Sequence, residues 1–188
     1  MDKKQKWMQR FVILMPHRDA RKLLEEMRAK LFSIGFHGAF SFPPAAPLAM
    51  VSKAFSREEL KELARNIRGL TKENDGKITS GGAAVIKCPD KRSFFGPRLD
   101  LPIDDRVFPE STKTKVLYTL SPPILCAALI DQESAVEPGQ MLCLSFRAAA
   151  LANLSIRPLG SGEAGYSFEW RISPLVWLPG LGKGPYTQ

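Results

Sequence analysis

Residues that could transfer protons near neutral pH are few in this chain of 188 residues. It contains two histidines, His17 and His37, and three cysteines, Cys88, Cys126 and Cys143. Histidine is the side chain whose ordinary pKa suits general acid and base chemistry at that pH. The segments around the histidines contain no other catalytic pattern, and the cysteines lack the close spacing of a metal site. We therefore expect no bound metal, no cofactor and no cysteine-based catalysis.

The charge of the chain is +8 at neutral pH, with an isoelectric point near 9.6. A basic surface favours polyanionic partners such as RNA or nucleotides. The lysines and arginines are spread along the sequence without a dense basic run, so ordinary solvated side chains explain the charge equally well. Long apolar runs and a secretory signal are lacking, which favours a cytoplasmic protein that does not associate with a membrane.

Hydrophobic periodicity predicts two β-then-α units in the N-terminal half. Residues 9–15 form a short apolar run of the kind found in buried strands, and a helix capped by Asp19 follows. A second short strand covers residues 48–52. Ser56 and Glu59 then have the spacing of a capping box, which marks the start of a second amphipathic helix.

The C-terminal half predicts mainly strands. Short apolar runs at residues 83–86 and 115–120 are separated by a polar, proline-containing stretch at 89–112, which we interpret as a long excursion. A long apolar run at residues 141–156 is followed by a glycine-rich turn and an alternating segment at 166–178, as expected of a hairpin. The chain is therefore expected to have an α+β fold.

This order of elements resembles that of the two-histidine (2H) phosphoesterase superfamily, which includes LigT-like 2'-5' RNA ligases and 2',3'-cyclic phosphodiesterases. The likeness is carried by residues 43–51, by the helix start at 56–60 and by residues 152–157. The first and last of these segments stand where the family has its two His-x-Thr/Ser strands. The strand expected at 166–178 also resembles the ending of the family.

The resemblance implies a LigT-like α+β fold of two lobes, with pseudo-symmetric antiparallel sheets and helices on the outside. The two motif strands would face each other across a central cleft. Residues 1–188 would form a single bilobal domain, with tails at 1–8 and 179–188.

Both family motifs are altered in this chain. In the family, one imidazole removes a proton from the attacking hydroxyl or water, the other protonates the leaving oxygen, and the Thr or Ser hydroxyls hold phosphate. Residues 48–50 are Leu-Ala-Met, without imidazole or hydroxyl, and residues 153–155 are Asn-Leu-Ser, which retain only the hydroxyl. An amide cannot exchange a proton near pH 7. The resemblance thus implies a pseudoenzyme that binds a nucleotide or RNA phosphate in the cleft.

Polar residues beside the altered motifs are candidate phosphate ligands. Asn153 and Ser155 are two positions apart, so they point to the same face of their strand, and Arg157 continues that face. A satisfied hydrogen-bonded pair explains the first two equally well, and a salt bridge at the rim explains Arg157. The candidate ligands are Asn153, Ser155, Arg157, Ser52, Lys53 and Arg147.

Two other functions remain open at this point. An active cyclic phosphodiesterase or RNA ligase-like enzyme could use non-standard groups, with His37 as the candidate catalytic residue. Alternatively, the fold could serve as a protein-interaction module that uses its cleft or the excursion at 89–112. Within that excursion, residues 94–98 (Phe-Phe-Gly-Pro-Arg) would form either a lid that stacks on a base or a hydrophobic anchor of the loop.

Overall fold

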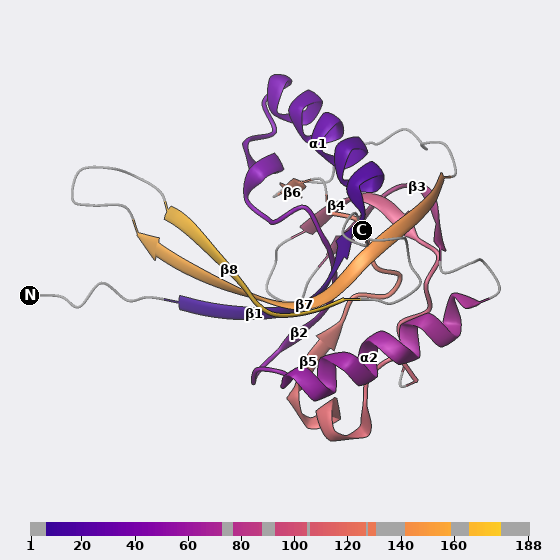
Figure 1. Cartoon of the computed structure of the whole chain (residues 1–188). Coiled ribbons are helices and arrows are strands. Elements are labelled where there is room, and N and C mark those ends of the chain that lie inside the picture. The colour runs from indigo at the N-terminus through magenta and orange to yellow at the C-terminus, as the bar shows by residue number, and fades with distance from the viewer. Residues whose placement is uncertain are drawn as a thin grey trace, which may run out of the picture.

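The structure is a computed structural model, and it describes residues 7–72, 77–87, 93–104, 106–126, 128–130, 142–158 and 166–177. Helices and strands alternate in the first half, and strands dominate the second (Figure 1). The elements are β1 (Trp7–Pro16), α1 (Arg18–Ser33), the 3₁₀ helix η1 (His37–Phe40), β2 (Ala46–Val51), α2 (Arg57–Leu70), β3 (Lys77–Lys87), β4 (Ser93–Leu99), the 3₁₀ helix η3 (Glu110–Lys115), β5 (Val116–Thr119), β6 (Ala128–Ile130), β7 (Leu142–Pro158) and β8 (Tyr166–Trp177). The expected α+β class is confirmed.

Eight strands form one hydrogen-bonded, antiparallel sheet in the order β5-β2-β1-β7-β3-β4-β6, with β8 also paired to β7. The long strand β7 makes this possible, because β3 pairs with its residues 142–145 and β8 with its residues 148–158. Figure 1 shows the sheet curled, with α1 above and α2 below the long strands β1, β7 and β8. The two-lobed, LigT-like arrangement stays a prediction.

The two faces of the sheet pack into different clusters. Val12 and Leu151 belong to a cluster that includes the buried sides of α1 and α2, and we call their side of the sheet the helix face. Phe11 and Ala152 alternate with them and belong to a second cluster, on what we call the aromatic face. In this second cluster the ring of Phe42 lies 4.7 Å from that of Trp170 and 5.0 Å from that of Phe94, in edge-to-face contacts.

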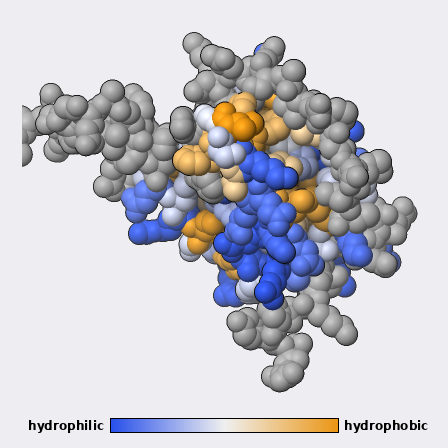
Figure 2. All heavy atoms as spheres, turned by 90° about the horizontal axis from the view of Figure 1, so that it is seen from above, coloured by the Kyte–Doolittle hydropathy of each residue, from blue (hydrophilic) through white to orange (hydrophobic). Residues whose placement is uncertain are grey.

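Helix α1 packs into the helix-face cluster and presents a hydrophilic surface to solvent. Figure 2 views the molecule from this side and shows hydrophilic side chains across the described part of the surface, with smaller hydrophobic areas beside them. The expected cap at Asp19 is wrong. His17 occupies the N-cap position without a capping hydrogen bond from its side chain, and Asp19 lies in the first turn, because the backbone N–H of His17 donates to the Ser145 carbonyl and the helix begins directly afterwards.

Helix α2 begins as the capping box predicts. The Ser56 hydroxyl accepts a hydrogen bond from the Glu59 N–H at 3.2 Å, and the Glu59 carboxylate accepts one from the Ser56 N–H at 2.6 Å. Its apolar stripe packs into the helix-face cluster, which confirms the predicted amphipathic helix. The buried residues of this stripe are Leu60, Leu63, Ala64 and Ile67.

Two boundaries differ from those expected. The excursion at 89–112 contains strand β4, and the side chains of Phe94 and Phe95 are buried against the sheet. Residues 94–98 therefore do not form a lid that could stack on a base. The sheet also begins at Trp7, so the last two residues of the expected N-terminal tail belong to β1. The expected tail at 179–188 lies outside the described residues.

Candidate functional site

The two altered motif segments lie in the same sheet, with β1 between them. Phe11 of β1 pairs with Met50 of β2 on one side and with Ala152 of β7 on the other. At the usual strand spacing the two segments are therefore about 10 Å apart within the sheet. The structure thus places both strands in one sheet on either side of β1, and the cleft between them that the resemblance implies stays a prediction.

The first motif offers no polar side chain. Leu48 and Ala49 are fully buried in the helix-face cluster, and Met50 packs against the aromatic-face cluster. Any anion site in this part of the sheet must therefore be built from β1, β7 and β8.

Strand pairing places Asn153 between two arginines. Arg10 of β1 lies opposite Asn153 on one side, and Arg171 of β8 lies opposite it on the other. Directly paired residues of antiparallel strands point to the same face, with their Cβ atoms about 5 Å apart. The arginines continue the alternation of Val12 and Leu151, so the row lies on the helix face. Two guanidinium groups and an amide thus converge on one surface, with Arg171 exposed and the other two partly buried.

Arg10 also connects this row to the end of β2. Its Nη1 donates to the backbone carbonyl of Ser52 at 3.2 Å. The Ser52 hydroxyl itself donates to the Lys115 carbonyl at 3.1 Å, so it already has a partner. Lys53 follows and is exposed. The structure therefore brings Ser52 and Asn153 to the same arginine.

Ser155 lies next to the row on the same face. It pairs with Met8 and with Glu169, and 9% of its surface is exposed. Glu169 is exposed and adds a carboxylate to this face. Two arginines and one glutamate leave an excess of one positive charge on this part of the sheet. The hydroxyl and the guanidinium groups are all capable of donating hydrogen bonds to an anion.

Lys115, close to this site, is committed to an ion pair. Its Nζ lies 2.6 Å from Glu59 Oε1, and both side chains are largely buried. Burial by itself would raise the pKa of Glu59, but hydrogen bonds from Lys115 and Ser56 outweigh it, and the pKa is lowered from its ordinary value. The positive charge of Lys115 is therefore balanced by the carboxylate of Glu59. Arg10 and Arg171, in contrast, form no ion pair with any other described residue.

Arg147, another predicted site residue, lies elsewhere. Arg147 is six residues from Asn153 along β7, about 20 Å at the usual rise, and its guanidinium lies 5.7 Å from the centre of the Trp177 ring. The backbone of Arg157 pairs with Ser167, but its side chain is outside the described part of the structure. Neither contact places these residues at the Arg10–Asn153–Arg171 row.

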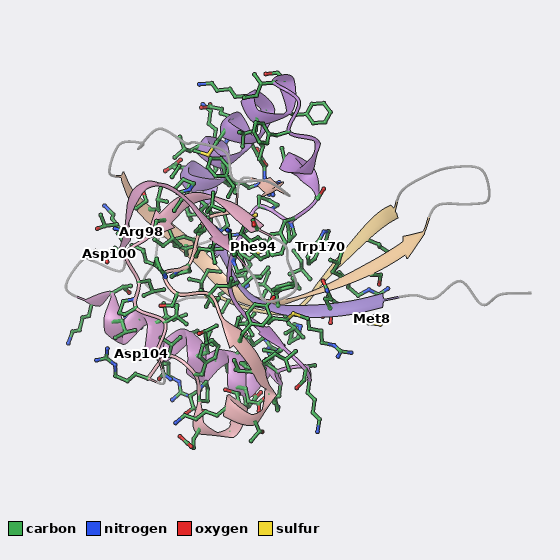
Figure 3. All side chains as sticks on the ribbon, turned by 180° about the vertical axis from the view of Figure 1, so that it is seen from behind. Met8, Phe94, Arg98, Asp100, Asp104 and Trp170 are labelled. Carbon is green, nitrogen blue, oxygen red and sulfur yellow. The ribbon has the colours of Figure 1, made fainter. Side chains whose placement is uncertain are left out.

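His37 lies in η1, and its side chain is also outside the described part. This 3₁₀ helix contacts α1 and β6, and the chain that follows it packs Phe42 onto the aromatic face. Figure 3 shows Phe94 and Trp170 in the middle of the molecule, while Met8 marks the free end of β1. The aromatic rings therefore fill the side of the sheet opposite Asn153.

Arg10 and Arg171 are the site residues that sequence reasoning missed. Arg10 directly precedes the apolar residues 11–15 of its strand and shares a face with Val12. This pattern indicates a polar group at the edge of a buried face. Arg171 gives no comparable signal. Its place opposite Asn153 depends on the pairing register of the β7–β8 hairpin.

The arrangement has the chemistry of an anion site. Among the described residues, no group of three or more histidine, cysteine, aspartate and glutamate side chains could hold a metal ion. No helix in the described ranges is long and apolar enough to cross a membrane. No family model, curated protein or solved structure that was compared with the chain matches it.

Proposed function

We propose that this cytoplasmic protein binds a phosphate group of a nucleotide or of RNA on the helix face, between Arg10 and Arg171, with little or no phosphodiesterase activity. The row Arg10–Asn153–Arg171 carries the proposal. Guanidinium groups match phosphate oxygens with paired hydrogen bonds, and the amide of Asn153 and the hydroxyl of Ser155 supply further donors. The net charge of +8 favours the approach of such anions.

The chemistry of the three side chains in the row favours binding over cleavage. Guanidinium and amide groups do not exchange protons near neutral pH, so they can position a phosphate ester but cannot serve as its acid and base. The resemblance in element order to 2H phosphoesterases, with both motifs altered, supports the same conclusion. The protein would thus be a LigT-like pseudoenzyme whose phosphate site has moved to the helix face.

Calorimetric titration with uridine monophosphate and uridine 2',3'-cyclic phosphate tests the proposal. Arg171→Gln should weaken binding about 10- to 100-fold, the range expected when a charged hydrogen bond of about 1.5–3 kcal/mol is lost. Lys22→Gln is the matched control, since it removes one exposed positive charge from α1. Equal affinities in both variants and the wild type, or no saturable binding by the wild type, would refute the proposal.

The cyclic nucleotide also distinguishes the alternatives. Chromatography of the reaction mixture should show that the cyclic phosphate is unchanged. Hydrolysis that is lost in His37→Ala would instead support the enzyme that uses His37. Recovery of a specific protein partner together with no nucleotide binding would favour the interaction module.

A further inference from the structure

Helix α2 carries its positive charges on one flank. Arg57, Lys61, Arg65 and Arg68 are spaced by four, four and three residues, and all four are exposed. At 100° per residue their side chains fall within an arc of about 80°, and at 1.5 Å per residue they extend over about 16 Å. We call this surface the basic flank.

Most of these charges are available to a partner. Lys61 contacts Glu58 at 3.0 Å, but both side chains are about half exposed or more, and such surface pairs contribute little. Arg57, Arg65 and Arg68 form no ion pair with another described residue. The exposed surface of α1 differs, because its cations are interspersed with acids; the charged residues there are Arg18, Asp19, Arg21, Lys22, Glu25, Glu26 and Lys30.

Contacts on the opposite flank fix the direction in which the basic flank points. Glu59 holds Lys115, and the Asn66 amide donates to the Val107 carbonyl at 3.2 Å, so that side of α2 lies against residues 107–115. The basic flank is on the other side of the buried stripe and faces away from this segment. Helix α2 itself packs against β7 and β8 (Figure 1), so the basic flank belongs to the part of the surface that these strands help to form.

The basic flank and the phosphate row therefore belong to one surface. Both lie on the helix face, and β8 supplies Arg171 to the row. Helix α2 begins five residues after Ser52, whose carbonyl accepts from Arg10. A chain of cations thus leads from the row along α2.

We infer that this surface binds the backbone of a single-stranded nucleic acid, with one phosphate between Arg10 and Arg171 and the following phosphates along the basic flank. The inference rests on the proposed function, which supplies the first phosphate. The four cations of the flank extend over about 16 Å, so they can contact several successive phosphates of one strand. An anionic membrane fits less well, because the apolar side of α2 is buried in the core and cannot insert, and a flat surface does not reach the recessed Ser155.

Fluorescence titration with a short labelled oligouridylate over a series of salt concentrations tests this inference. For single strands, the slope of log K against log salt changes by about 0.7 for each phosphate contact. The double variant Arg65→Gln with Arg68→Gln should therefore reduce the slope by about 1.4. Glutamine is a good helix former and both positions are exposed, so the variant should fold.

The matched control is Arg18→Gln with Lys22→Gln, which removes two exposed charges about one helical turn apart from α1. Its slope should equal that of the wild type. Equal reductions in both double variants, or no reduction in the α2 variant, would overturn the inference. Loss of binding to anionic vesicles in the α2 variant, with the oligonucleotide slope unchanged, would overturn it in favour of a membrane surface.

Uridine monophosphate separates this inference from the proposed function. It should bind the α2 variant as tightly as the wild type, because it occupies only the Arg10–Asn153–Arg171 row. Binding of the mononucleotide without measurable binding of the oligonucleotide would overturn the inference and leave the proposed function standing. If the α2 variant binds uridine monophosphate more weakly than the wild type does, the first phosphate also contacts the basic flank. That result would overturn the assignment of the flank to the following phosphates.

Discussion

Asn153 lies between two guanidinium groups because β1 and β8 both pair with β7 in a register that sets Arg10 and Arg171 opposite it. An isolated asparagine on a strand binds anions weakly. Between Arg10 and Arg171, the amide of Asn153 can orient a phosphate oxygen that the two guanidinium groups attract. At the scale of the residue, the candidate site therefore depends on charge next to a neutral hydrogen-bond donor.

Replacing Asn153 with aspartate separates these contributions. Asn153→Asp places a carboxylate between the arginines, so it should weaken binding of uridine monophosphate more than tenfold through repulsion and occupation of the guanidinium donors. Asn153→Ala loses only a neutral hydrogen bond, and binding should fall a few-fold. Calorimetric titration measures both. Equal effects of the two variants would contradict a site held together by Arg10 and Arg171.

At the scale of the element, local patterns predict more than long-range pairing does. The start of α2 was predictable because Ser56 and Glu59 are neighbours in sequence, and their hydrogen bonds need no other element. Strand β4 was missed because Gly96 and Pro97 interrupt its alternation, although Pro97 still lies opposite Ala83 in the sheet. The cap predicted at Asp19 was wrong because the helix start depends on a distant contact. The backbone N–H of His17 donates to the carbonyl of Ser145 in β7, and no local pattern reveals this bond.

The ion pair at the start of α2 predicts a pH dependence of stability. The pKa of Glu59 is lowered in the folded protein, because the hydrogen bonds from Lys115 and Ser56 outweigh the effect of burial. Its contribution is therefore present above the pKa of the unfolded chain and is lost as the pH falls through the lower pKa of the folded protein. Glu59→Gln keeps the capping acceptor but loses the charge, which should cost about 1–2 kcal/mol at neutral pH.

Urea unfolding over a pH series measures this effect. The difference in free energy of unfolding between the wild type and Glu59→Gln should shrink as the pH falls below the ordinary pKa of glutamate, about 4.3. Glu58→Gln is the control, since Glu58 is exposed and its ion pair within the described part of the chain is with Lys61, also at the surface. A difference for Glu59→Gln that stays constant down to low pH would show that the ion pair with Lys115 does not stabilise the fold.

For the whole molecule, the fold decides where on the surface the positive charges of the sequence are gathered. The sequence shows a charge of +8 without a basic run, whereas the fold packs α2, with its basic flank, against β8, the strand that carries Arg171. Asn153 and Ser155 were predictable as one face by alternation alone. Arg10 and Arg171 were not, because their place depends on two strand registers, and a register shifted by one residue would turn them to the opposite face.

Binding of phosphate on the helix face can be followed at single residues by an NMR titration with uridine monophosphate. The side-chain N–H signals of Arg10, Asn153 and Arg171 report on the helix face. The indole N–H of Trp170 donates to the Ser41 carbonyl at 2.9 Å and reports on the aromatic face. We expect saturable shifts of the first three signals and an unchanged Trp170 signal. A shift of the Trp170 signal with the other three unchanged, or no saturable shift at all, would show that phosphate does not bind on the helix face.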